Sequence, residues 1–135
     1  MSLSALLERV EACQGPDRAL DAAICRLTRY TSEQPDGTWL DTFEGGYRHT
    51  LNPPALTASV DAALALIGRV MPGLYMWRLD FDDEPTSHPA DALLCWTGGT
   101  ASEGGATPAL ALCAALLAAM IGEEAKPSPP STVTP

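Results

Sequence analysis

Four stretches of the chain place hydrophobic residues three and four positions apart, which is the spacing of one face of an α-helix. The first stretch runs from Leu3 to Cys13 and ends at Gly15-Pro16. The second has Pro16 at its first position and continues to Arg29. Because so few residues separate these two helices, we expect them to pack as an antiparallel hairpin.

The third and fourth helices also have clear start and stop signals. The third is expected to begin at Thr57 or Ser59, both favourable N-caps, and to stop at Pro72-Gly73. The fourth begins with Thr107-Pro108 and ends at Gly122.

The fourth helix is unusual because no charged residue occurs between Ala109 and Ile121. A helix that is apolar on all sides must be buried on most of them. A membrane span needs about 20 apolar residues and usually basic flanks, whereas this run is shorter and Glu123-Glu124 follows it. We therefore expect it between a sheet and the other helices, or in a subunit interface, and we expect no membrane association.

Between the third and fourth helices the hydrophobic period changes to two, which is typical of a β-strand. One strand is predicted from Leu74 to Phe81, and a second from Asp91 to Thr97, with an acidic turn between them. They are expected to form an antiparallel hairpin. A glycine-rich connection from Gly98 to Gly105 then leads to the last helix.

Two further segments lack a helical period. Residues Thr31 to Pro54 contain Pro and Gly at many positions. Within them Thr38 to Phe43 is predicted as a short edge strand, and a binding loop is the alternative. From Glu123 onward the chain is polar and rich in Pro, so we expect a disordered tail. The sequence thus predicts one domain over residues 1–122 and a disordered Pro-rich tail over 123–135.

Charge and cysteine content exclude several classes of function. The 135 residues include 8 Lys and Arg against 17 Asp and Glu, which gives a net charge of −9. Direct binding to nucleic acid or to an anionic membrane is disfavoured, because neutralising phosphates requires a basic face. The four cysteines form no CxxC motif, so neither a zinc site nor a redox motif is indicated. We expect reduced structural thiols and a cytoplasmic protein without a signal peptide.

Four segments, taken in order, resemble a family of small phage and prophage proteins, the phage ABA sandwich domain family. Gly15–Asp21 is similar to its opening "GPDRxLD", and Leu56–Leu64 is similar to its "YTASxDAAL" segment. The aromatic strand Leu74–Arg78 follows, and Ala106–Leu117 resembles the "ATPALALCxAxL" helix. Leu56 stands where that family has an aromatic residue, so no role of that ring carries over.

The resemblance implies a layered α-β-α fold, a phage or prophage origin and a bacterial host cell, and it implies no reaction. Together with the periodicity it predicts an α+β domain in which about four helices pack on a small antiparallel sheet of two or three strands. Such a sheet has exposed edges and two faces to cover. We therefore expect self-association, as a two-fold homodimer.

The acidic turn is the candidate metal site. It gathers Asp80, Asp82 and Asp83, with His88 and Asp91 close in sequence, and hard cations need several such oxygen ligands. The spacing matches no calcium loop, and a solvated hairpin tip is the simpler interpretation. We therefore expect no metal and no other cofactor.

The glycine-rich connection is the candidate anion site, because a helix N-terminus offers free N–H groups and a positive dipole. Gly99, Gly104 and Thr107 are the candidate ligand-binding residues. Gly105 and Ala106, however, stand where a phosphate-binding loop needs Lys and Ser or Thr. A connector that lets the helix lie close to the sheet explains the glycines as well.

The large aromatic residues are candidates both for the core and for partner binding. We place Trp77 in the core, and Trp39 and Tyr47 at a recognition site in the long loop. Cys95 and Cys113 lie in apolar segments and are interpreted as structural thiols, so no catalytic residue is predicted.

These features favour a non-enzymatic binding or interaction module that forms a homodimer and has a host or phage protein as its partner. The alternative is a nucleotide- or metal-binding or hydrolytic protein that uses the Gly98–Gly105 segment and the Asp80–Asp91 acidic turn.

Overall fold

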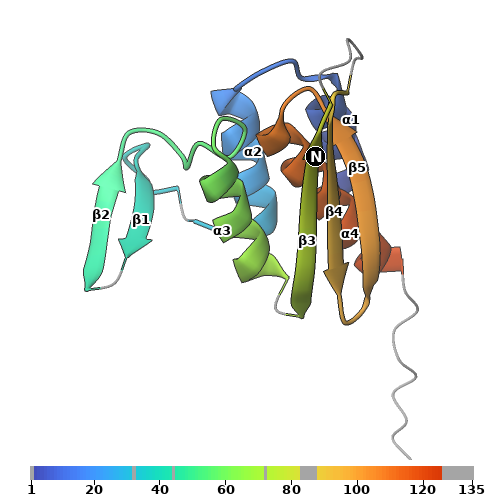
Figure 1. Ribbon diagram of the computed structural model, residues 1–135. Coiled ribbons are helices and arrows are strands. Elements are labelled where there is room, and N and C mark those ends of the chain that lie inside the picture. The colour runs from blue at the N-terminus through green and yellow to red at the C-terminus, as the bar shows by residue number, and fades with distance from the viewer. Residues whose placement is uncertain (1, 32, 44, 72, 83–87, 126–135) are drawn as a thin grey trace, which may run out of the picture.

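The computed structural model describes residues 2–31, 33–43, 45–71, 73–82 and 88–125. These residues form four helices and two small antiparallel sheets (Figure 1). In chain order the elements are α1 (Leu3–Ala12), α2 (Arg18–Thr28), β1 (Trp39–Phe43), β2 (Gly46–Thr50), α3 (Val60–Val70), β3 (Leu74–Phe81), β4 (Ala90–Trp96), β5 (Gly99–Gly105) and α4 (Pro108–Ala125). The predicted α+β class is confirmed.

All four helices begin after a residue whose side-chain oxygen accepts a hydrogen bond from an N–H three residues later. This satisfies one of the N–H groups that a helix leaves without an internal partner. The capping residues are Ser2, Asp17, Ser59 and Thr107, with N···O distances of 3.1 to 3.2 Å. The local sequence therefore fixes where each helix starts.

The larger sheet has the strand order β3-β4-β5, with antiparallel neighbours, and β1 and β2 form a separate hairpin. In Figure 1 this hairpin stands to the left of the helices, far from the three-stranded sheet. Its first residue, Trp39, is only 4% exposed and belongs to the core. The hairpin is therefore attached to the domain by the base of β1.

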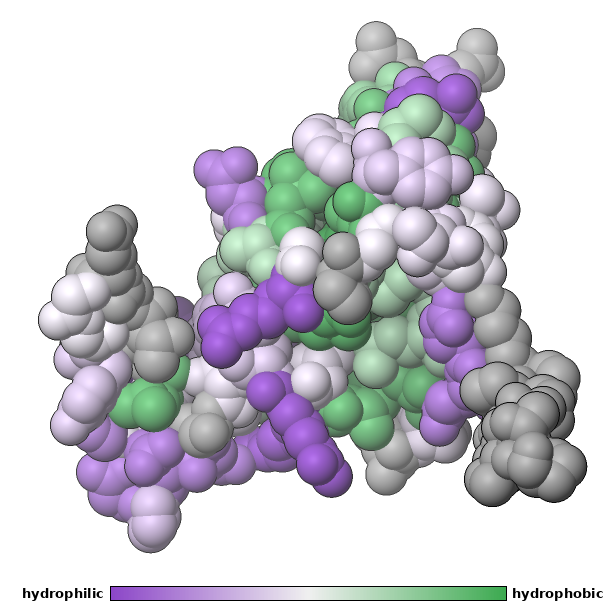
Figure 2. Space-filling view, turned by 90° about the horizontal axis from the view of Figure 1, so that it is seen from below, coloured by the Kyte–Doolittle hydropathy of each residue, from purple (hydrophilic) through white to green (hydrophobic). Residues whose placement is uncertain are grey.

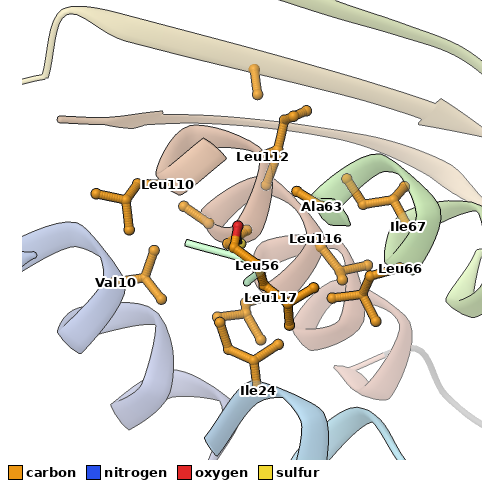
Figure 3. Close-up of a cluster of buried hydrophobic side chains, with 14 of the residues drawn as sticks. Val10, Ile24, Leu56, Ala63, Leu66, Ile67, Leu110, Leu112, Leu116 and Leu117 are labelled. Atoms are coloured by element: carbon orange, nitrogen blue, oxygen red, sulfur yellow. Dashed lines mark hydrogen bonds between the residues drawn. The ribbon is translucent and has the colours of Figure 1, made fainter. Parts of the chain in front are cut away.

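Helix α4 is the centre of the fold. It contacts β4 and β5 on one side and α1 and α3 on others. Figure 3 shows Leu112 directed at the strands, whereas Leu117 faces Ile24 of α2. By length and composition α4 is a candidate membrane span, but ten of its 18 residues are buried within the protein. The predicted place between the sheet and the other helices is confirmed.

The layers therefore run from the sheet to α4 and then to α1 and α2, with α3 at the side (Figures 1 and 3). Among the residues described, no helix covers the opposite face of the three-stranded sheet. That face holds Arg78, Asp91 and Ser102, all of which are exposed. The helices on both faces that the family resemblance implies are thus replaced by a stack of helices on one face.

Strand β5 and α4 approach each other closely. A Cβ atom added to Gly105 would lie 2.6 Å from the backbone N of Ala111 and 3.0 Å from its Cα. Such distances are too short for any side chain, so only glycine fits at this point. The expected glycine-rich connection is in fact a strand, and its glycine at the end allows helix and sheet to touch.

Three other expectations need correction. The stretch from Thr31 to Pro54, expected as an edge strand or a binding loop, contains a second strand, β2, that was not expected. Helix α4 continues through Gly122 to Ala125, so the first three residues of the expected tail are helical, and residues 126–135 lie outside the described residues. Trp77, expected in the core, is 47% exposed.

Candidate interaction surface on strand β3

Strand β3 carries most of the large hydrophobic side chains that remain exposed. The described residues include six such side chains, and four of them lie in β3. These four residues are called the β3 hydrophobic cluster below. They are Tyr75 (70% exposed), Met76 (45%), Trp77 (47%) and Phe81 (59%).

The position of α4 explains why Trp77 and Phe81 of this cluster are exposed, whereas Met76, opposite Cys95, is on the outer face. Trp77 lies opposite Leu94 of β4, and Phe81 lies opposite Ala90, so both aromatic rings are on the sheet face that carries the helices. Helix α4, however, packs mainly against β5 and β4 and contacts β3 only weakly. The helix side of β3 therefore extends beyond the area that α4 covers.

β3 is also an edge strand. It pairs with β4 on one side, and no strand of the described residues pairs with its other side. An edge strand presents alternate backbone N–H and C=O groups that have no strand partner, and another chain can pair with them. Large apolar side chains on a free strand edge are the features of a surface that binds an extended peptide segment.

The outer face of β3 is charged. The Arg78 guanidinium lies 3.1 Å from the Asp80 carboxylate, and both side chains are largely exposed. Asp80 lies opposite Asp91 on β4, whereas Arg78 lies opposite the apolar Leu93. This part of the outer face therefore carries one arginine and two carboxylates, which is an excess of negative charge.

A bulge limits the part of β3 that is regular. The pairing register with β4 shifts between Leu74 and Met76, so that Tyr75 has no partner on β4. Bulges and charged side chains are the means by which natural edge strands restrict uncontrolled pairing. The regular stretch of β3 therefore runs from Met76 to Phe81.

The residues predicted as an anion site do not come together. Gly99 and Gly104 lie near opposite ends of β5, where they pair with Trp96 and Asp91. Thr107 caps α4, because its hydroxyl oxygen accepts a hydrogen bond from Leu110 N at 3.2 Å. The candidate anion site is thus a strand followed by a helix cap.

The acidic turn forms no metal site within the part of the chain that is described. Asp80 and Asp82 are exposed, and Asp83 lies outside the described residues. No group of three or more His, Cys, Asp or Glu side chains is close enough to hold a metal ion in that part of the chain.

Trp39 and Tyr47, the predicted recognition pair, are also separate. Trp39 is buried, with the Arg26 guanidinium 5.5 Å from its ring centroid. Tyr47 is 66% exposed on β2 and makes an edge contact with His49. The burial of Trp39 places it in the core, while Tyr47 stays on an exposed strand.

Three of the segments that carry the family resemblance meet in the core. The Asp21 carboxylate accepts hydrogen bonds from the backbone N–H and the hydroxyl of Thr57, both at 2.7 Å. Cys113 Sγ lies 3.5 Å from the carbonyl oxygen of Leu56, to which it donates. Burial raises the pKa of Asp21, and the two bonds from Thr57 oppose this increase. These motif residues connect α2, the segment before α3, and α4, which is a structural role.

Two of the buried thiols, Cys25 and Cys113, are poor nucleophiles. Burial, and then the nearby Asp21 carboxylate, raises the pKa of Cys25 and of Cys113 to about 12. A thiol is nucleophilic only as a thiolate, so both cysteines remain inert at neutral pH. His49 contacts Thr38 and His88 contacts the carbonyl of Glu11, and both histidines are exposed, whereas these two thiols are buried.

A pocket of about 480 Å³ lies where the ends of several helices meet. Figure 2 views this end of the molecule, where hydrophobic residues fill the middle. Leu3, Leu27, Val70, Met71 and Met120 line it, with the carboxylates of Glu123 and Glu124 at its rim. The Glu123 carboxylate accepts a hydrogen bond from Trp96 Nε1, so this carboxylate already has a partner within the protein. Such a lining holds apolar groups and offers no acid–base pair.

No family model, curated protein or solved structure matches this chain. The resemblance to the phage ABA sandwich domain family therefore stays a prediction from sequence.

Proposed function

We propose that this protein is a non-enzymatic interaction module that binds an extended segment of a protein chain along β3. The observation that carries the proposal is the β3 hydrophobic cluster on a strand edge without a strand partner in the described residues. Aromatic and Met side chains are enriched in protein interfaces, and strand addition supplies backbone hydrogen bonds in the same place.

The two faces of β3 define the chemistry of the bound segment. Trp77 and Phe81 on the helix side favour apolar side chains, whereas Asp80 and Asp91 on the outer side favour basic ones. A segment that alternates apolar residues with polar residues, at least one of them basic, therefore matches both faces.

Two observations count against the alternative of a small-ligand or hydrolytic protein. The Gly98–Gly105 segment is mostly strand, and its glycines do not surround a phosphate position. The pKa values of Cys25 and Cys113 are both raised, so neither thiol is a thiolate at neutral pH. A host or phage protein as partner, a phage origin and a cytoplasmic location remain part of the proposal on the sequence evidence given above.

A strand-forming peptide tests the proposal directly. The probe is the nine-residue peptide Thr-Val-Lys-Val-Thr-Val-Lys-Val-Thr, titrated into the full chain while tryptophan fluorescence and amide hydrogen exchange are followed. Trp39 and Trp96 are buried, so Trp77 reports on binding. We expect a blue shift of the fluorescence and slower exchange of the β3 amides at saturation.

The matched control is the same peptide with N-methyl groups on alternate residues, which removes the hydrogen bonds of one edge and keeps the side chains. It should neither shift the fluorescence nor protect β3. Protection of amides outside β3, or equal binding of both peptides, would overturn the proposal.

A further inference from the structure

We propose that the segment that binds along β3 is β3 of a second copy of this chain, paired antiparallel about a two-fold axis that passes through Leu79. This inference rests on the proposed function, because it names the partner of the same surface. The two three-stranded sheets would then join into one six-stranded sheet with the order β5-β4-β3-β3-β4-β5.

The charges on the outer face favour this register. With Leu79 opposite the second copy's Leu79, Arg78 lies opposite the second copy's Asp80, and Asp80 lies opposite the second copy's Arg78. Within each copy, Asp80 already lies opposite a like charge, Asp91 on β4. The second copy's guanidinium then lies beside this pair of carboxylates in addition to Arg78 of the same copy, which is 3.1 Å from Asp80.

The helix-side face is complementary in the same register. Trp77 lies opposite the second copy's Phe81, and the two Leu79 side chains meet at the axis. Aromatic pairs and apolar pairs directly opposite each other stabilise antiparallel strands. The exposed part of the β3 hydrophobic cluster on this face, Trp77 at 47% and Phe81 at 59%, is what such pairing would cover.

Neighbouring registers are less favourable. If the axis passes through Arg78, that arginine faces itself, and if it passes through Asp80, that carboxylate faces itself. An axis through Trp77 places the bulge at Tyr75 opposite Leu79, where the ladder is irregular. Centred on Leu79, the ladder from Trp77 to Phe81 lies entirely in the regular part of β3.

The other edge of the sheet does not offer such pairing. β5 has the sequence GTASEGG and carries no large apolar side chain. Its side chains provide no apolar or charge complementarity to a second copy. Pairing through β3 is therefore the self-association that the described residues support.

Charge exchange across the axis tests both the partner and the register. The variants are Arg78→Asp, Asp80→Arg and the double variant Arg78→Asp/Asp80→Arg, with the mass of the full chain measured by sedimentation equilibrium over a range of concentrations. We expect a dimer for the unchanged chain. Each single variant places like charges opposite each other at two symmetric positions and should raise the dissociation constant by about tenfold or more.

Two results should restore association. The double variant again pairs unlike charges, so it should dimerise like the unchanged chain. An equimolar mixture of the two single variants should form a mixed dimer, because every cross-strand charge pair is then unlike. Both side chains are largely exposed, so the fold should survive, and circular dichroism of each variant checks this.

Arg18→Asp is the matched control for Arg78→Asp, since it lowers the net charge by the same amount at an exposed helix start outside β3. It should leave the dissociation constant unchanged. A chain that stays monomeric at high concentration would overturn the second copy as partner, while strand-peptide binding at β3 would still support the proposed function. A dimer that all the charge variants leave unchanged would also overturn the inference.

Discussion

Strands β3 and β5 are the two edges of one sheet, but α4 packs closely against β5 and hardly contacts β3. β5 is built from small residues, and α4 lies so close to it that Gly105 has no room for a side chain. β3 is built from large residues, and α4 hardly contacts it. The edge with the greater hydrophobic content is thus the one left exposed.

The difference shows that the position of α4 depends on how closely its backbone can approach the sheet and not only on the hydrophobicity of the strand beneath it. On the face that α4 covers, β4 has Ala90 and Ala92, and β5 has Gly99, Ala101 and Gly105. These small residues allow the backbone of α4 to approach the sheet. Close approach of a broad apolar helix buries more surface than large strand residues would allow. The large side chains of β3 are then available for a partner.

The largest expected effect is a difference in the free energy of unfolding between a variant at a buried tryptophan and a variant at an exposed one. Trp39→Ala should lower the free energy of unfolding by about 3–5 kcal/mol, because it removes a buried aromatic side chain. Trp77→Ala should lower it by less than about 1 kcal/mol in the monomeric chain, since that side chain is 47% exposed. Urea denaturation at low protein concentration measures both, and equal losses would remove the contrast between covered and uncovered regions.

A smaller effect tests the contact between β5 and α4. Gly105→Ala should destabilise the protein by about 1–3 kcal/mol, because the new methyl group meets the Ala111 backbone and helix and strand must separate. Gly68→Ala, on the exposed side of α3 where a methyl group meets nothing within 4 Å, should instead stabilise by about 0.5–1 kcal/mol. Thermal unfolding of the two variants should move the melting temperature in opposite directions.

The smallest effect is a pH dependence on the covered side of the molecule. Burial raises the pKa of Asp21 above the usual 3.8, so the folded state holds that proton more tightly than the unfolded state. The associated stability is complete below pH 3.8 and is lost as pH rises through the folded pKa.

Asp21→Asn cannot titrate, so the stability of the unchanged chain relative to this variant should fall as pH increases from 3 to 7. Melting temperatures of both proteins across this range provide the measurement. A difference for Asp21→Asn that increases with pH would contradict the raised pKa.

The candidate surface was visible in the sequence only as a pattern. Alternation from Leu74 to Phe81 indicated a strand, and the strand is there. Trp77 was expected in the core because a large ring fills volume there, and this is wrong, since period two shows that residues share a face but not whether anything covers that face. Trp39, in a stretch without a clear pattern, is buried for a reason that only the fold provides.

By itself, the sequence determined the four helices, three of the five strands and the central burial of α4, because these depend on local hydrogen bonding and on the hydrophobic pattern of each segment. The start of α2 was expected at Pro16, but the helix begins at Arg18, where Asp17 is the cap. Tertiary structure alone decided the β2 and β5 strands, the stacking of all helices on one face and the exposure of β3. These features depend on which surfaces reach closest contact, and the small residues on β4 and β5, far in sequence from α1 and α2, determine where α4 can lie.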